Sequence, residues 1–199
     1  MLDLPQKFII FDTEYTAWEG SFDREWSGPG EHKELVQIAA AKVEGEGFNE
    51  ADTFSIYIRP RVNPKLSDFF INLTGITQEK ADQEGVDFEE AIKKFTAWSE
   101  DLPLYSFGDD VNVLTENCKL LGIDSPFDPG RFSNIRELFK KYGIPADDYM
   151  SSTIVRAFGQ KPARRGHEAL NDVRTVIDGL KALAEIQAKP LTSRGESVS

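Results

Sequence analysis

The chain has 199 residues, of which 40% are hydrophobic and 11% aromatic, and this suits one compact globular domain with a sizeable core. A formal net charge of −11 excludes a broad, sequence-independent hold on duplex nucleic acid, which depends on many Lys and Arg contacts to phosphates. A single cysteine excludes an internal disulfide, and no signal peptide or long apolar run is recognisable, so we expect a soluble cytoplasmic protein with no membrane partner.

Three apolar segments near the N-terminus predict neighbouring β-strands. They cover residues 7–14, 34–45 and 52–60, and their close spacing favours an antiparallel meander. A fourth short strand is predicted at 102–107. Apolar residues at helical spacing then predict the following helices: 88–98, 110–121, 135–142, 147–158 and 166–186. We expect a single domain over residues 1–187 and a disordered C-terminal tail over 188–199, which lacks apolar periodicity.

Two carboxylates end the first predicted strand. Side chains alternate along a strand, so Asp12 and Glu14 of the FDTE segment point to the same side, with Cβ atoms roughly 6–7 Å apart. Hard divalent cations require oxygen ligands, and this spacing can span a pair of them. The alternative is that the strand simply emerges into water at Asp12.

Two later segments carry further candidate site residues. Asp109 and Asp110 stand between a predicted strand and a helix, where an acid either caps the helix or projects into a site. His167 precedes Asp172 by five positions, an offset of roughly 140° on a regular helix. The two therefore share a face only if His167 lies before the helix or in its first turn, and Gly166 favours such a loosened start.

Taken together, the FDTE, D-V-N-V-L and H-x4-D segments resemble the DEDDh family of 3′–5′ exonucleases, with most similarity to the branch of enhanced-RNAi exonucleases and sporulation-kinase inhibitors. The resemblance implies a ribonuclease H-like α/β fold with a mixed five-stranded sheet flanked by helices on both faces. It also implies that two Mg²⁺ or Mn²⁺ ions are held by four acids and that His167 is the general base. These acids are Asp12, Glu14, Asp110 and Asp172; Asp110 is chosen because it fits the family's D-x-x-[FV]-L pattern, which leaves Asp109 as a helix cap.

The same resemblance suggests substrate contacts. Thr13 and the LTGIT segment, with Leu73, Thr74, Gly75 and Ile76, are expected to meet the terminal nucleotide, although a plain turn explains the glycine equally well. Two arginines ahead of the histidine are expected to hold phosphates or steady a lid, with a solvated basic loop as the alternative: Arg164 and Arg165.

The long connection after the first strand carries three aromatic residues, Trp18, Phe22 and Trp26. They either stack on unpaired bases or fold back as a small satellite core.

The function expected from these features is hydrolysis of single-stranded RNA or short oligonucleotides from the 3′ end to nucleoside 5′-monophosphates. RNA is favoured over DNA, and no protein partner is predicted. A DNA-directed proofreading or repair exonuclease and a non-catalytic regulatory module on the same fold stay open as alternatives.

Overall fold

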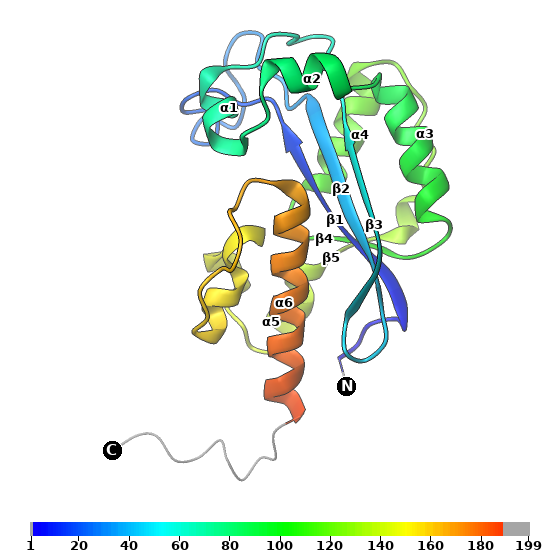
Figure 1. The fold of residues 1–199 in the computed structure, drawn as a ribbon, viewed down its shortest axis with the longest axis vertical. Coiled ribbons are helices and arrows are strands. Elements are labelled where there is room, and N and C mark those ends of the chain that lie inside the picture. The colour runs from blue at the N-terminus through cyan, green and yellow to red at the C-terminus, as the bar shows by residue number, and fades with distance from the viewer. Residues whose placement is uncertain (1, 189–199) are drawn as a thin grey trace.

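The computed structural model describes residues 2–188, and a five-stranded mixed sheet in the order β3-β2-β1-β4-β5 forms its centre (Figure 1). The long strands β1 (Lys7–Tyr15), β2 (Leu35–Glu44) and β3 (Asn49–Tyr57) make an antiparallel meander. The short strands β4 (Leu104–Ser106) and β5 (Phe132–Asn134) run parallel to β1. The predicted fold class is confirmed, but the sequence does not locate β5, because three partly exposed residues carry no readable alternation.

The helices lie on both faces of this sheet: α1 (Asp68–Thr74), α2 (Gln78–Glu84), α3 (Phe88–Ser99), α4 (Asp110–Leu120), α5 (Ile135–Lys141) and α6 (Ala169–Ala188). The helices predicted at α3, α4 and α5 are confirmed to within one residue, and the helix predicted over 166–186 is present as α6 but begins three residues later, at Ala169. The two short helices are not predicted, since each has seven residues and depends on a side-chain cap, from Ser67 and Thr77 respectively.

The segment predicted as a helix over 147–158 is instead two 3₁₀ turns, Ala146–Asp148 and Ser151–Phe158. The second turn packs against α6. Its tighter geometry is typical of connecting segments whose shape is set by tertiary contacts rather than by helix propensity.

Strict alternation along β1 divides the core into two layers. Phe8 and Ile10 belong to the cluster formed with α5 and α6, whereas Ile9 and Phe11 belong to the cluster formed with α3 and α4. A strand buried on both faces is continuously apolar, which is why the four residues of β1 between the exposed Lys7 and Asp12 are all apolar. Because the period is two, Asp12 and Glu14 continue the series of Phe8 and Ile10 and face the side of α6.

A buried carboxylate fixes the segment that leads into α1. Glu34, just before β2, is 1% exposed and accepts hydrogen bonds from the backbone N–H groups of Arg61, Val62 at 2.9 Å and Asn63 at 2.7 Å. Charge-assisted bonds of this kind are stronger than neutral ones. They hold the connection from β3 to α1, which Figure 1 shows beyond the C-terminal end of β1.

Nothing in the fold tests the predicted domain boundary at residue 187, which stays a prediction. Residue 188, assigned to the tail by its composition, is the last residue of α6, and the remainder of the predicted disordered tail lies outside the described residues. Within residues 2–188, no helix combines the length and apolarity needed to span a bilayer.

Candidate active site

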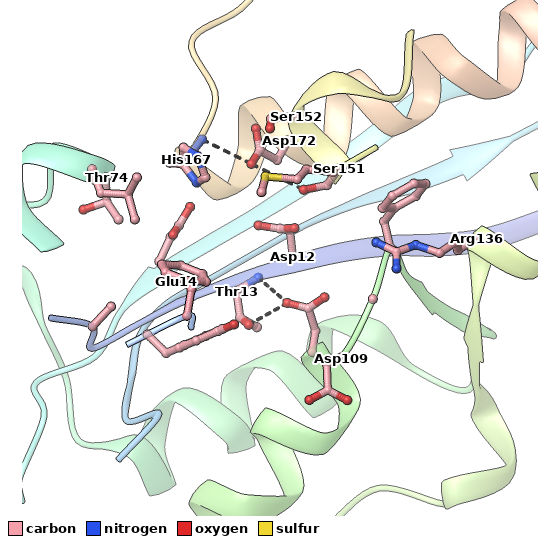
Figure 2. Close-up of a pocket in the computed structure, with 18 of the residues that line it drawn as sticks. Asp12, Thr13, Glu14, Thr74, Asp109, Arg136, Ser151, Ser152, His167 and Asp172 are labelled. Atoms are coloured by element: carbon pink, nitrogen blue, oxygen red, sulfur yellow. Dashed lines mark hydrogen bonds between the residues drawn. The ribbon is translucent and has the colours of Figure 1, made fainter. Parts of the chain in front are cut away.

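Three carboxylates from two distant elements meet at the C-terminal part of β1. Asp12 and Glu14 come from the strand, and Asp172 comes from the first turn of α6. One carboxylate oxygen of each lies within 4.8 Å of those of the other two. Their exposed fractions are 9%, 8% and 3%, so the group is largely withdrawn from water (Figure 2). The sequence-predicted convergence of these three residues is therefore present in the structure.

Asp110, at the start of α4, lies beside this group but is held by β1. Its Oδ1 accepts hydrogen bonds from the backbone N–H of Thr13 at 3.0 Å and from the Thr13 hydroxyl at 2.7 Å, which Figure 2 draws as the two dashed lines that start at Thr13. Asp109 occupies the N-cap position, yet its side chain makes no bond to the helix backbone. It accepts instead from the side-chain amide of Asn112 and lies 3.5 Å from the Lys33 ammonium. Asp109 is thus the expected helix cap, but it caps through its carbonyl and not through its side chain.

His167 stands two residues before α6, as the five-residue offset requires. Its backbone N–H donates to Oδ2 of Asp172 at 3.2 Å, which closes the turn (Figure 2). The residue has φ of 60°, a left-handed conformation that is costly for a side chain with a Cβ. Such strain is found at functional sites where surrounding contacts enforce it. The imidazole is thereby placed on the wall of the cavity that Asp12 and Glu14 line.

Burial and mutual repulsion raise the pKa values of all four acids. Burial, followed by the charges of Asp110, Asp172 and Glu14, raises the pKa of Asp12 well above its ordinary value. Burial and the neighbouring acids raise the pKa of Glu14 to about 8. Burial raises the pKa of Asp172 to about 7 and that of Asp110 to about 6, in each case against opposing hydrogen bonds.

The donor set fits divalent cations. Across residues 2–188, no Lys or Arg forms an ion pair with any of the four acids. Oδ1 of Asp172 is buried and has no hydrogen-bond partner among the residues that the structure describes. Unpaired buried carboxylates are costly unless a cation offsets their charge, and oxygen-only sites suit Mg²⁺, Mn²⁺ and Ca²⁺. Asp12, Glu14 and Asp172, with Asp110 beside them, are thus the residues that can hold metal.

The predicted substrate residues divide into two groups in the structure. Thr13, Leu73 and Thr74 line the same cavity of about 540 Å³ as the carboxylates. Gly75 ends α1 with φ of 78°, and Ile76 is buried in a small core with Phe70. Neither of these last two residues is among the residues that line the cavity.

The two arginines ahead of His167 are engaged elsewhere. Arg164 forms an ion pair with Asp178 of α6 at 2.6 Å. Arg165 donates to the backbone carbonyls of Asn72 at 3.1 Å and Leu73 at 3.4 Å. Neither side chain lines the cavity, but Arg165 ties the loop before α6 to the end of α1.

The aromatic connection after β1 folds back in part as a satellite core, whereas stacking of its rings on bases stays a prediction. Trp26 donates from Nε1 to the carbonyl of Thr16 at 2.8 Å and packs on Tyr15 with ring centroids 5.4 Å apart, as a satellite core does. Phe22 is 49% exposed and lines the cavity together with Phe69 of α1. Their ring centroids are 6.3 Å apart.

Sequence reasoning missed several residues of the cavity wall, namely Phe69, Phe107, Arg136, Met150, Ser151 and Ser152. Ser151 donates to Oδ2 of Asp172 at 3.5 Å. No periodicity or motif marks these residues, because they come from turns and helix starts that only the tertiary fold brings to β1.

Four acids and one histidine, arranged in this way on a mixed sheet with helices on both faces, define a DEDDh-type 3′–5′ exonuclease domain. A family model described as exonuclease matches residues 9–180. The chain belongs to this exonuclease family.

Relatives and solved structures agree with that assignment. The chain is 27% identical over 179 residues to 3′–5′ exoribonuclease 1 of Mus musculus, covering 84% of this chain and 50% of the relative. It therefore spans about half the length of that relative. It is 28% identical over 183 residues to the Bacillus subtilis protein named "Probable 3'-5' exonuclease KapD", covering 89% of this chain and 84% of the other. The nuclease domain of 3′hExo, a DEDDh family member bound to rAMP, superposes with a TM-score of 0.78, 25% identity and 94% coverage of both chains.

Proposed function

We propose that this protein hydrolyses single-stranded RNA or short oligonucleotides from the 3′ end and releases nucleoside 5′-monophosphates. The observation that carries the proposal is the buried group of Asp12, Glu14 and Asp172, with ligand oxygens within 4.8 Å, in one cavity with His167. A phosphodiester is attacked at phosphorus only if its negative charge is offset, and a pair of divalent cations on this group serves that purpose.

The chain's own residues have separate tasks in this scheme. Asp12, Glu14, Asp110 and Asp172 hold two Mg²⁺ or Mn²⁺ ions, which when bound offset charge on the phosphoryl oxygens. His167 accepts a proton as water attacks the phosphorus. The bond from phosphorus to the 3′ oxygen of the preceding nucleotide breaks, and that oxygen takes up a proton to become the new 3′ hydroxyl.

The environment of His167 supports the role of a base. Burial, with a smaller contribution from the charge of Arg165, lowers the pKa of its imidazole below the ordinary value of 6.5. The neutral form, which alone can accept a proton, is therefore present at neutral pH.

In this proposal the terminal nucleotide lies against α1. Leu73 and Thr74 line the same cavity as Glu14, and Figure 2 shows Thr74 on the far side of His167 from Asp172. Phe22 and Phe69 offer apolar rings on which an unpaired base stacks. The preference for RNA is supported by relatives named exoribonucleases, and the preference for single strands by the net charge of −11.

The test is a digest of RNA and DNA oligonucleotides of matched sequence, labelled at the 5′ end, with Mg²⁺, Mn²⁺ or EDTA. We expect a ladder that shortens from the 3′ end, 5′-monophosphate products and faster loss of RNA. The Asp12→Asn variant is the control for contaminating nucleases. Faster loss of DNA would replace the substrate assignment, whereas an inactive wild type with every metal would favour a regulatory binding module.

A further inference from the structure

The cavity contains one cation that none of the roles above uses. Among the described residues that line it, Arg136 of α5 is the single Lys or Arg. Figure 2 shows its guanidinium directed toward the centre of the cavity, on the opposite side of Asp12 from Thr74 and His167. A lone positive charge in a cavity lined by acids requires an explanation.

Arg136 is loosely held by the protein. A guanidinium has five N–H donors, but the side chain makes one hydrogen bond to a described residue, from Nη2 to the carbonyl of Tyr149 at 3.4 Å. Its Nη1 lies 3.9 Å from Asp147, whose other oxygen is 3.3 Å from Lys140. Nε is buried without a partner among the described residues. Burying an unpartnered N–H costs free energy, which a bound anion would offset.

The surroundings keep this cation beside the site rather than in solvent. The guanidinium carbon lies 4.8 Å from the centre of the Phe107 ring, and this ring also lines the cavity. Stacking of this kind orients the planar group and leaves its N–H edge available to an acceptor. The four acids are not its partners, since none of them forms an ion pair with Arg136.

We propose that Arg136 binds the phosphate on the 5′ side of the scissile one, between the second and third nucleotides from the 3′ end. The inference rests on the proposed function. In that proposal the terminal nucleotide lies against Leu73 and Thr74, and the scissile phosphate lies at the carboxylates. The nucleotides on its 5′ side then continue across Asp12 to the opposite side of the cavity, toward which the Arg136 guanidinium points. Arg136 is then a substrate-binding residue that makes a trinucleotide a better substrate than a dinucleotide.

The test uses dinucleotides, which have only the scissile phosphate, and trinucleotides, which have the second one. We expect Arg136→Gln to lower kcat/KM for trinucleotides about tenfold, the loss of one charge-assisted hydrogen bond, and to leave dinucleotides within about twofold. Arg136→Lys should restore part of the loss, because it keeps the charge but not the planar fork. Arg156→Gln, which removes an exposed arginine outside this cavity, is the matched control.

A neutral methylphosphonate at the second linkage of the trinucleotide tests the contact itself. The wild type should lose about tenfold with this substrate, and Arg136→Gln should lose nothing further, as expected for two partners of one interaction. A binding assay by fluorescence anisotropy in the Asp12→Asn background should show the same pattern without turnover. The inference would be overturned if Arg136→Gln lowered kcat/KM equally for dinucleotides and trinucleotides. It would also be overturned if the losses from Arg136→Gln and from the methylphosphonate were independent of each other, and in both cases the exonuclease function would stand. A wild type that cleaves no oligonucleotide would instead overturn the function, and with it this contact.

Discussion

Replacement of Glu14 by glutamine should make the metal-free protein more stable while it weakens metal binding. Burial and the neighbouring acids raise the pKa of Glu14 from 4.5 to about 8 in the folded state. The folded state therefore binds this proton more tightly than the unfolded state does. It follows that the free energy of unfolding falls as the pH rises from about 4.5 to about 8.

The size of the expected stabilisation follows from the width of this pH interval. One pH unit within it is equivalent to about 1.4 kcal/mol, so keeping a proton on Glu14 in the folded state, which the unfolded chain releases, destabilises the metal-free fold by about 3 kcal/mol at pH 7. A buried glutamine amide without a full set of partners costs about 1 kcal/mol. The net gain of Glu14→Gln is then about 2 kcal/mol at pH 7 and about zero at pH 5. In a domain of this size, 2 kcal/mol raises Tm by roughly 4–8 °C.

Thermal unfolding followed by circular dichroism in EDTA, at pH 5 and pH 7, measures this difference. Glu116→Gln, an exposed change on α4, is the control and should leave Tm within 1 °C, a change of about 0.3 kcal/mol or less. Added Mn²⁺ should stabilise the wild type more than the variant, because a ligand of the folded state stabilises it in proportion to its affinity. A variant that is less stable than the wild type at pH 7, or equally shifted at both pH values, would refute the reasoning.

Three further changes test separate parts of the structure. His167→Ala should lower single-turnover rates by about 10²–10⁴ with little change in Mn²⁺ affinity by calorimetry, and a parallel loss of affinity would make the histidine a ligand instead. Asp110→Asn should lower kcat by at least about 100-fold and Asp109→Asn by less than about threefold, and the reverse order would reassign the second motif. Glu34→Ala should lower the free energy of unfolding in urea by about 3 kcal/mol, because three backbone N–H groups lose a buried acceptor, whereas a loss under about 1 kcal/mol would contradict that role.

The sequence by itself determined the parts of the protein that depend on short-range periodicity. Alternation along β1 placed Asp12 and Glu14 on one side of the strand, and helical spacing required His167 to lie before α6 or in its first turn if it was to share a face with Asp172. Those two patterns, with the acid that begins α4, marked these five residues as candidates, and the fold class and their roles were implied by the resemblance that the three segments carry.

Only the tertiary structure decided which other residues reach the cavity. Arg164 and Arg165 are close to His167 in the sequence, yet they bind Asp178 and the carbonyls at the end of α1. Arg136 is distant in sequence and carries no motif, but it lines the cavity. The physical reason is that the direction of a long side chain outside a regular pattern is set by contacts between distant segments. Such contacts cannot be inferred from the local sequence pattern.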